Sequence, residues 1–140
     1  MQSLGRIRAP LIAVVALVAT VALTSVSSAH RKFYKSSVSI AVAKVAGDDL
    51  ARGEVDSKRR ACRRNRTVIL FQESKPGNTG QFLEIGRTKT DDGGNWTVPI
   101  QNGIKKGRAY HAQAKTKRVR NRGGHKHICK SKFSPDVIGG

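Results

Sequence analysis

The stretch of sequence that decides the fold is Thr67-Val68-Ile69-Leu70-Phe71. Each of its residues is β-branched, apolar or aromatic, and residues of these kinds are enriched in β-strands. A segment rich in loop-forming residues, Lys75-Pro76-Gly77-Asn78-Thr79-Gly80, follows shortly after it. The stretch therefore predicts a β-strand, which is the strongest strand signal in the chain.

The segments that precede this strand alternate with a period of two residues. Val38, Ile40 and Val42 are separated by small or polar residues, as in a strand that is buried on one face. Gly47-Asp48-Asp49 predicts a turn, and a second short strand is expected over Ala51–Ser57. Two strands joined by a turn are therefore expected before the decisive one.

The segments that follow it predict a hairpin. Leu83–Thr90 alternates, and Asp91-Asp92-Gly93-Gly94-Asn95 predicts a sharp turn because Gly and Asn accept positive φ. The chain then returns through a strand with Trp96, Val98 and Ile100 on one face.

The remainder of the chain continues the β pattern. Arg108–Thr116 predicts a strand with Tyr110 on its core face, and Lys117–His127 predicts a basic hairpin loop. A last strand is expected over Ile128–Ile138, broken late by Pro135. No segment has apolar residues at helical spacing. About seven short strands at spacings near ten residues predict an all-β fold, an antiparallel Greek-key β-sandwich.

The first residues have the pattern of a secretory signal peptide. Arg6 and Arg8 precede Ala9–Ala29, a charge-free stretch with an apolar centre and a small-residue end. A basic start, an apolar centre and a small-residue exit predict a cleaved signal helix over 1–29, followed by one β-sandwich domain over 30–140. The alternative is a retained membrane anchor, although the apolar centre is shorter than the roughly 20 residues of a spanning helix. We expect a protein of the cell envelope or the extracellular space, with no membrane span after cleavage.

The net charge is strongly positive and unevenly distributed. The 140 residues include 27 Lys or Arg and 9 Asp or Glu, a formal net charge of +18, and loss of 1–29 would leave +16. One basic run occupies Lys58–Arg66, expected to be a loop, and the other extends from Lys105 to Lys132. No acidic residue lies between Asp92 and Asp136. Such a distribution makes anionic partners plausible.

We interpret the two basic runs as a polyanion-binding patch. Its partners would be anionic polymers or surfaces of the envelope or extracellular space, such as teichoic acid, lipid headgroups, DNA or glycosaminoglycan. Sequence-specific nucleic-acid recognition is not expected, because Tyr110 and Phe133 are the only nearby aromatic residues. The residues predicted to bind are Lys58, Arg59, Arg60, Arg63, Arg64, Arg66, Lys117, Arg118, Arg120, Arg122, Lys126 and Lys130.

The two cysteines, Cys62 and Cys129, lie within or beside these basic runs. In an exported protein they are expected to form a disulfide, which would draw the two runs into one patch. Two alternatives are free thiols and a metal site, because His125, His127 and Cys129 would share one face of a strand. The basic surroundings disfavour a cation, so no metal site is expected.

Four segments resemble the carboxypeptidase-regulatory-like, or prealbumin-like, β-sandwich domains. They are Gly53-Glu54-Val55, then residues 66–70 (RTVIL), 86–98 (GRTKTDDGGNWTV) and 107–112 (GRAYHA). The chain is also similar to a group of exported actinobacterial proteins that have two cysteines at these places. The resemblance implies a non-enzymatic accessory or binding module.

Motifs of catalysis are missing from the sequence. It contains neither G-x-S-x-G nor H-E-x-x-H, and the Asp91–Asn95 segment lacks the ligand spacing of an EF-hand. His111 alternates away from the core and is expected to face solvent. We therefore expect no enzyme and no cofactor. The alternatives are a protein-binding module with incidental charge, docked through a sheet edge, and a secreted hydrolase or metal-dependent enzyme using His125 and His127.

Overall fold

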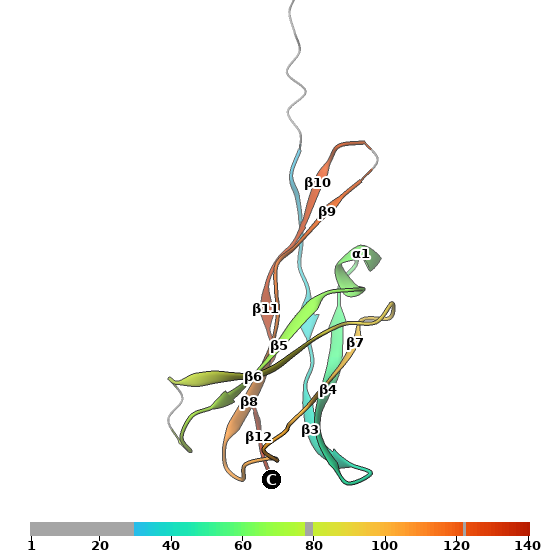
Figure 1. Cartoon of the computed structure of the whole chain (residues 1–140). Helices are drawn as coiled ribbons and strands as arrows, with labels where there is room; N and C mark the ends of the chain where they lie inside the picture. Colours follow the sequence, from blue (N-terminus) through green and yellow to red (C-terminus); the bar gives the residue numbers. More distant parts are fainter. Residues whose placement is uncertain (1–29, 78–79, 122) are drawn as a thin grey trace, which may run out of the picture.

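A computed structural model describes residues 30–77, 80–121 and 123–140. The predicted signal helix over 1–29 lies outside the described residues. The described chain is all-β except for one helical turn, and it forms two facing sheets from which a hairpin extends (Figure 1). The predicted all-β sandwich is confirmed, but twelve short strands replace the expected seven among the described residues.

The first sheet is centred on the decisive strand. This strand, β5 (Thr67–Glu73), pairs antiparallel with β6 (Phe82–Lys89) on one side and with β8 (Ala109–Ala114) on the other. Two short strands, β11 (Lys132–Phe133) and β12 (Val137–Ile138), pair with the far edge of β8. The chain thus returns to lie beside β5 after a crossing to the other sheet, which is the Greek-key connection.

The second sheet is centred on β4 (Asp48–Asp56). On one side it pairs with β7 (Asn95–Pro99), and on the other with β2 (Ser37–Val38) and β3 (Ala41–Val45). The strand predicted through Val38, Ile40 and Val42 is therefore divided in two. The two parts keep one register against β4, and the strand is interrupted only at Ser39 and Ile40. The Ser39 carbonyl oxygen would lie 2.0 Å from a Cβ atom at Gly53, so the strand predicted around Gly53 needs glycine there.

The core lies between these two sheets. It contains the predicted inward residues of β7, Trp96 and Val98 at 3% exposure, and Tyr110 of β8, which is fully buried. The Tyr110 hydroxyl accepts a hydrogen bond of 2.7 Å from the Lys105 amide. The decisive strand contributes Val68 and Leu70, both with no exposed surface. The predicted alternation of β7 and β8 is confirmed.

A third sheet, which we call the arm, extends from the sandwich. It consists of β1 (Lys32–Tyr34), β10 (Lys126–Cys129) and β9 (Lys117–Arg120), with β1 parallel to β10 and β9 antiparallel to it. Figure 1 shows the hairpin of β9 and β10 projecting beyond the two facing sheets. The predicted hairpin loop is therefore mostly paired, and β1 was not predicted.

The structure also corrects the predicted extent of the last strand and of the first basic loop. The expected last strand over Ile128–Ile138 is divided among β10, β11 and β12, because the chain leaves the arm after Cys129 and enters the first sheet. The expected basic loop contains the helical turn α1 (Arg60–Arg63). Four residues are too few to show a helical period in the sequence.

The described residues after position 29 contain both facing sheets and the core between them. The sheets, their core and the bridge between Cys62 and Cys129 are formed within this segment. A core enclosed by its own sheets and fastened by its own disulfide is what an independently folding domain needs. We expect residues 30–140 to fold without residues 1–29.

Candidate functional site

The disulfide joins the helical turn to the base of the arm. Cys62 of α1 and Cys129 of β10 are bonded, with their Cα atoms 5.5 Å apart and no exposed surface on either residue. The predicted pairing is confirmed, and it indicates an oxidising environment. The alternative metal site loses one of its three ligands, because Cys129 is committed to the bridge.

Arg66 lies against this bridge and is completely buried. Its Nε donates to the carbonyl oxygen of Lys115 at 2.8 Å, and its Nη1 donates to that of Cys62 at 3.1 Å. Nη1 also donates to Ser36 Oγ at 2.6 Å, and Nη2 donates to the carbonyl oxygen of Lys130. The prediction that Arg66 contacts a polyanion is corrected, because its guanidinium is buried and donates its hydrogen bonds to groups within the protein.

These contacts make Arg66 a structural cation. Burial lowers the pKa of its guanidinium, and three backbone carbonyl dipoles replace the water that burial removes. Two of the carbonyls belong to Cys62 and to Lys130, the residue after Cys129. Arg66 and the bridge therefore hold the same connection between α1 and the arm, which we call the disulfide junction.

The arm has two faces, which the strand register separates. Residues paired across adjacent strands share a face, and successive residues of one strand alternate between faces. Tyr34, Cys129 and Lys117 are paired across the three strands and lie on the side of the disulfide, the inner face. The next row, Phe33, Ile128 and Arg118, therefore lies on the opposite, outer face, together with Lys126 and Arg120.

The inner face of the arm packs towards α1. The Arg59 guanidinium lies 5.3 Å from the centre of the Tyr34 ring, and the His127 ring centre lies 5.4 Å from it. Lys117 Nζ donates to the Arg64 carbonyl oxygen at 2.6 Å. Burial, and then the charges of Arg64, Arg66 and Lys89, lower the pKa of Lys117. Arg59 and Lys117 therefore contact groups of the protein rather than facing solvent freely.

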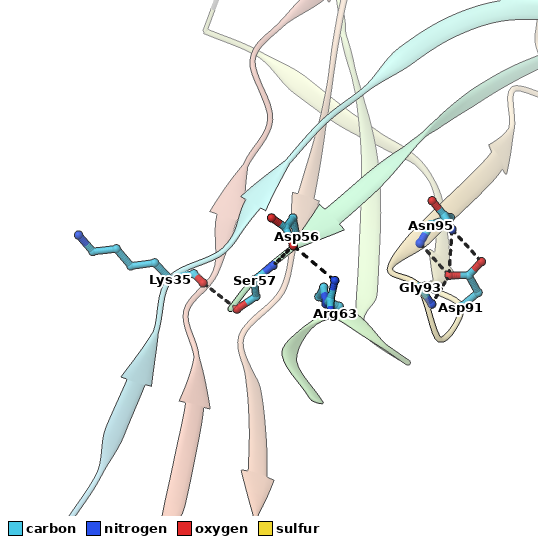
Figure 2. A network of polar contacts seen from close by, with 7 residues as sticks. All are labelled: Lys35, Asp56, Ser57, Arg63, Asp91, Gly93 and Asn95. Atoms are coloured by element: carbon cyan, nitrogen blue, oxygen red, sulfur yellow. Dashed lines mark hydrogen bonds and ion pairs between the residues drawn. The ribbon is translucent and has the colours of Figure 1, made fainter. Parts of the chain in front are cut away.

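The two basic runs therefore do not merge into one patch, contrary to the sequence-based inference. The disulfide brings α1 to the arm, but Arg118, Arg120 and Lys126 lie on the face that points away from it. On the α1 side, Arg63 forms an ion pair with Asp56 at 3.7 Å (Figure 2). The exposed basic residues left on that side are Lys58, Arg60 and Arg64.

The outer face of the arm contains a pocket of about 150 Å³. Its lining residues are Arg31, Arg118, Val119, Arg120, Lys126 and Ile128. Four of the lining residues are cations, and none is acidic. Lys130 extends this surface, since its Nζ lies 5.2 Å from the centre of the Phe33 ring. The remaining predicted arm residue, Arg122, lies outside the described residues.

The cations of the arm lack acidic partners. In residues 30–77, 80–121 and 123–140, the ion pairs of Lys and Arg are Arg63–Asp56 and Arg87–Glu84, neither of which involves the arm. Like charges without neutralising neighbours produce a positive potential that concentrates anions nearby. The arrangement can hold anionic groups electrostatically.

His111 is more enclosed than predicted. It lies on the outer face of the first sheet, where its ring centre is 4.1 Å from that of Phe82, 5.2 Å from Phe133 and 5.3 Å from Phe71. Its Nδ1 is 3.1 Å from an Asp136 carboxylate oxygen, and its side chain is 14% exposed. The cluster was missed because its rings come from four strands that are separated in sequence.

His127 is buried at 7% exposure. Burial first, and then Arg59, His125 and Lys32, lower the pKa of its ring. Among the described residues no group of three or more His, Cys, Asp or Glu is arranged to hold a metal ion. Across the same residues, no helix has the length and apolar character needed to cross a membrane.

The Asp91–Asn95 segment forms the predicted turn between β6 and β7. Asp91 Oδ1 accepts hydrogen bonds from the amides of Gly93 at 2.9 Å and Asn95 at 2.8 Å, and Oδ2 accepts one from Asn95 Nδ2 at 3.1 Å (Figure 2). Both carboxylate oxygens thus serve the turn. The hydrogen bond from the Asn95 side chain is the largest cause of a lowered Asp91 pKa.

This lowered pKa makes the turn sensitive to acid. A carboxylate whose pKa is lower in the folded than in the unfolded chain stabilises the fold above the unfolded value of about 3.9, and loses that effect as the pH falls through the folded value. We expect Asp91→Ala to be less stable than the parent near neutral pH, and the difference to shrink below about pH 4. Urea unfolding of both proteins across a pH series measures it; a difference that is constant with pH would contradict the assignment.

Comparison with known proteins gives no match: no family model, no curated protein and no solved structure matches the chain. The resemblance to carboxypeptidase-regulatory-like domains therefore stays a prediction.

Proposed function

We propose that residues 30–140 form an exported, non-enzymatic module that binds anionic polymers or surfaces at the cell envelope or outside the cell. The observation that carries this proposal is the outer-face pocket, where four cations converge and no acidic residue lines the surface. The disulfide and the signal-like start of the sequence support an extracellular location.

The architecture suits electrostatic binding. A paired hairpin holds the backbone of Arg118, Arg120 and Lys126 at fixed spacing, so little backbone freedom remains to be lost on binding. Guanidinium groups offer forked donors that match phosphate and sulfate oxygens. Recognition of this kind reads charge and spacing rather than a nucleotide sequence.

The test is a titration of residues 30–140 with polyphosphate at several salt concentrations. Each contact releases condensed counter-ions, so about five contacts should weaken binding by about 10²- to 10³-fold between about 50 and 200 mM salt. Fluorescence anisotropy with labelled polyphosphate measures the affinity. Absence of binding at low salt, or affinity that does not change with salt, would refute the proposed function.

A protein partner on a sheet edge is the second candidate. In the described residues β3 pairs only with β4, which leaves its other edge open, and Val45 at its end is 36% exposed. An open edge can accept a strand from another chain, although Lys44 within β3 works against it. Capture of a defined protein from envelope extract at moderate salt, lost on Val42→Pro, would favour this candidate.

A further inference from the structure

The outer face of the arm combines positive charge with an exposed aromatic ring. Phe33 is 54% exposed and is paired with Ile128 in the register of β1 and β10. Arg118 continues the same row on β9, and Lys126 and Arg120 form the neighbouring row. An apolar line is therefore bordered by cations along one side of a paired sheet.

Phe33 is held in an arrangement that suits a boundary between polar and apolar surroundings. The Lys130 ammonium lies 5.2 Å from the centre of its ring, an attractive distance for a cation and a π-face. Lysine can keep its ammonium in a polar layer while the ring beside it enters an apolar one. Phe33 and Lys130 together therefore present apolar and cationic groups in the same direction.

Binding of a soluble polyanion would not explain why the Phe33 ring is exposed. A hydrated phosphate or sulfate chain interacts with the cations and leaves Phe33 in water. The surface of a bilayer with acidic lipids uses both parts, because the headgroups attract the cations and the boundary of the acyl chains accepts the ring. Charge complementarity and the exposed ring thus point to the same occupant.

The position of the face in the sequence is consistent with this occupant. The charge-free stretch Ala9–Ala29 ends two residues before Arg31, the first cation of the pocket. During export, before the predicted cleavage, such a stretch enters the membrane, and the chain that follows it at the surface is then the arm.

We propose that the outer face of the arm docks on a membrane surface that contains acidic phospholipids, with Phe33 entering the interface between headgroups and acyl chains. This inference rests on the proposed function, since the same cations bind the headgroups. It adds a specific partner and gives Phe33 a role that charge alone does not give.

The test compares two phenylalanines of nearly equal exposure. Residues 30–140 are mixed with vesicles of phosphatidylcholine containing about one-third phosphatidylglycerol, and with vesicles of phosphatidylcholine alone, and binding is measured by co-sedimentation. Phe33→Ser is the test variant and Phe133→Ser is its control, because Phe133 is 50% exposed but lies on the first sheet. Polyphosphate binding of every variant is measured alongside.

We expect binding to the acidic vesicles only. Phe33→Ser should weaken it by about tenfold, the effect of withholding one half-exposed ring from the interface, whereas Phe133→Ser should change it by less than about twofold. Phe33→Ser should leave polyphosphate affinity unchanged. Equal vesicle binding by Phe33→Ser and the parent, or polyphosphate binding without vesicle binding, would overturn membrane docking and leave the proposed function standing. Failure to bind both probes would overturn the two together.

Discussion

Arg66→Ala should destabilise the domain by about 4 kcal/mol. The substitution leaves the carbonyl oxygens of Lys115, Cys62 and Lys130 without their donor inside the protein. An unsatisfied buried polar group costs about 1–3 kcal/mol, and the cavity left by the side chain adds to that cost. Urea unfolding of the oxidised protein measures the difference.

Two further variants separate the causes of this effect. Arg66→Lys keeps the charge but has one compact donor group in place of a fork, so we expect it to recover only part of the stability. Arg64→Ala removes an exposed arginine two residues away and should change stability by less than about 0.5 kcal/mol. If Arg66→Ala proved as mild as Arg64→Ala, the structural role of Arg66 would be wrong.

Joint replacement of Cys62 and Cys129 by alanine should also cost about 4 kcal/mol. The bridge joins residues 67 positions apart, and the loop-entropy estimate for a closed loop of that length gives this value. Reduction of the parent protein should lower its stability by a similar amount and should leave the alanine variant unaffected. An intact mass that does not change on reduction, or equal stability of parent and variant, would contradict the bridge.

The consequences of losing the bridge should be greatest in the arm. Cys129 terminates β10, and the arm has few buried side chains apart from His127 and Cys129. Regions with little buried surface open at lower free energy than the core. Hydrogen exchange of the Ile128 amide should therefore increase more than that of Leu70, which lies in the fully buried centre of β5.

The sandwich could be predicted because the burial of its strands leaves a pattern in the sequence. Trp96 and Val98 alternate with exposed residues in β7, and the apolar run of β5 needs burial on both faces. Such patterns are visible in sequence because burial determines them. The disulfide followed from cysteine number and the expected compartment, so its position needed no structural information.

The arm could not be predicted in the same way. Its strands β1 and β9 are mostly exposed, so no apolar alternation identifies their partners or their register. The burial of Arg66 was hidden for a related reason, because a basic residue inside a basic run looks like a surface residue. Two signals could have indicated it: Arg66 directly precedes the decisive strand, and it follows Cys62 by four residues.

The measurement that tests the outer face most directly compares two charge reversals of equal size. One variant carries Arg118→Glu, Arg120→Glu and Lys126→Glu on the outer face of the arm; the other carries Lys58→Glu, Arg60→Glu and Arg64→Glu on the α1 side. All six residues are exposed. Each variant replaces three cations by three glutamates, so the two variants have the same net charge. We expect polyphosphate affinity at about 50 mM salt to fall by at least about 100-fold in the first variant and by less than about fivefold in the second. Equal losses in the two variants would contradict a binding surface on the arm.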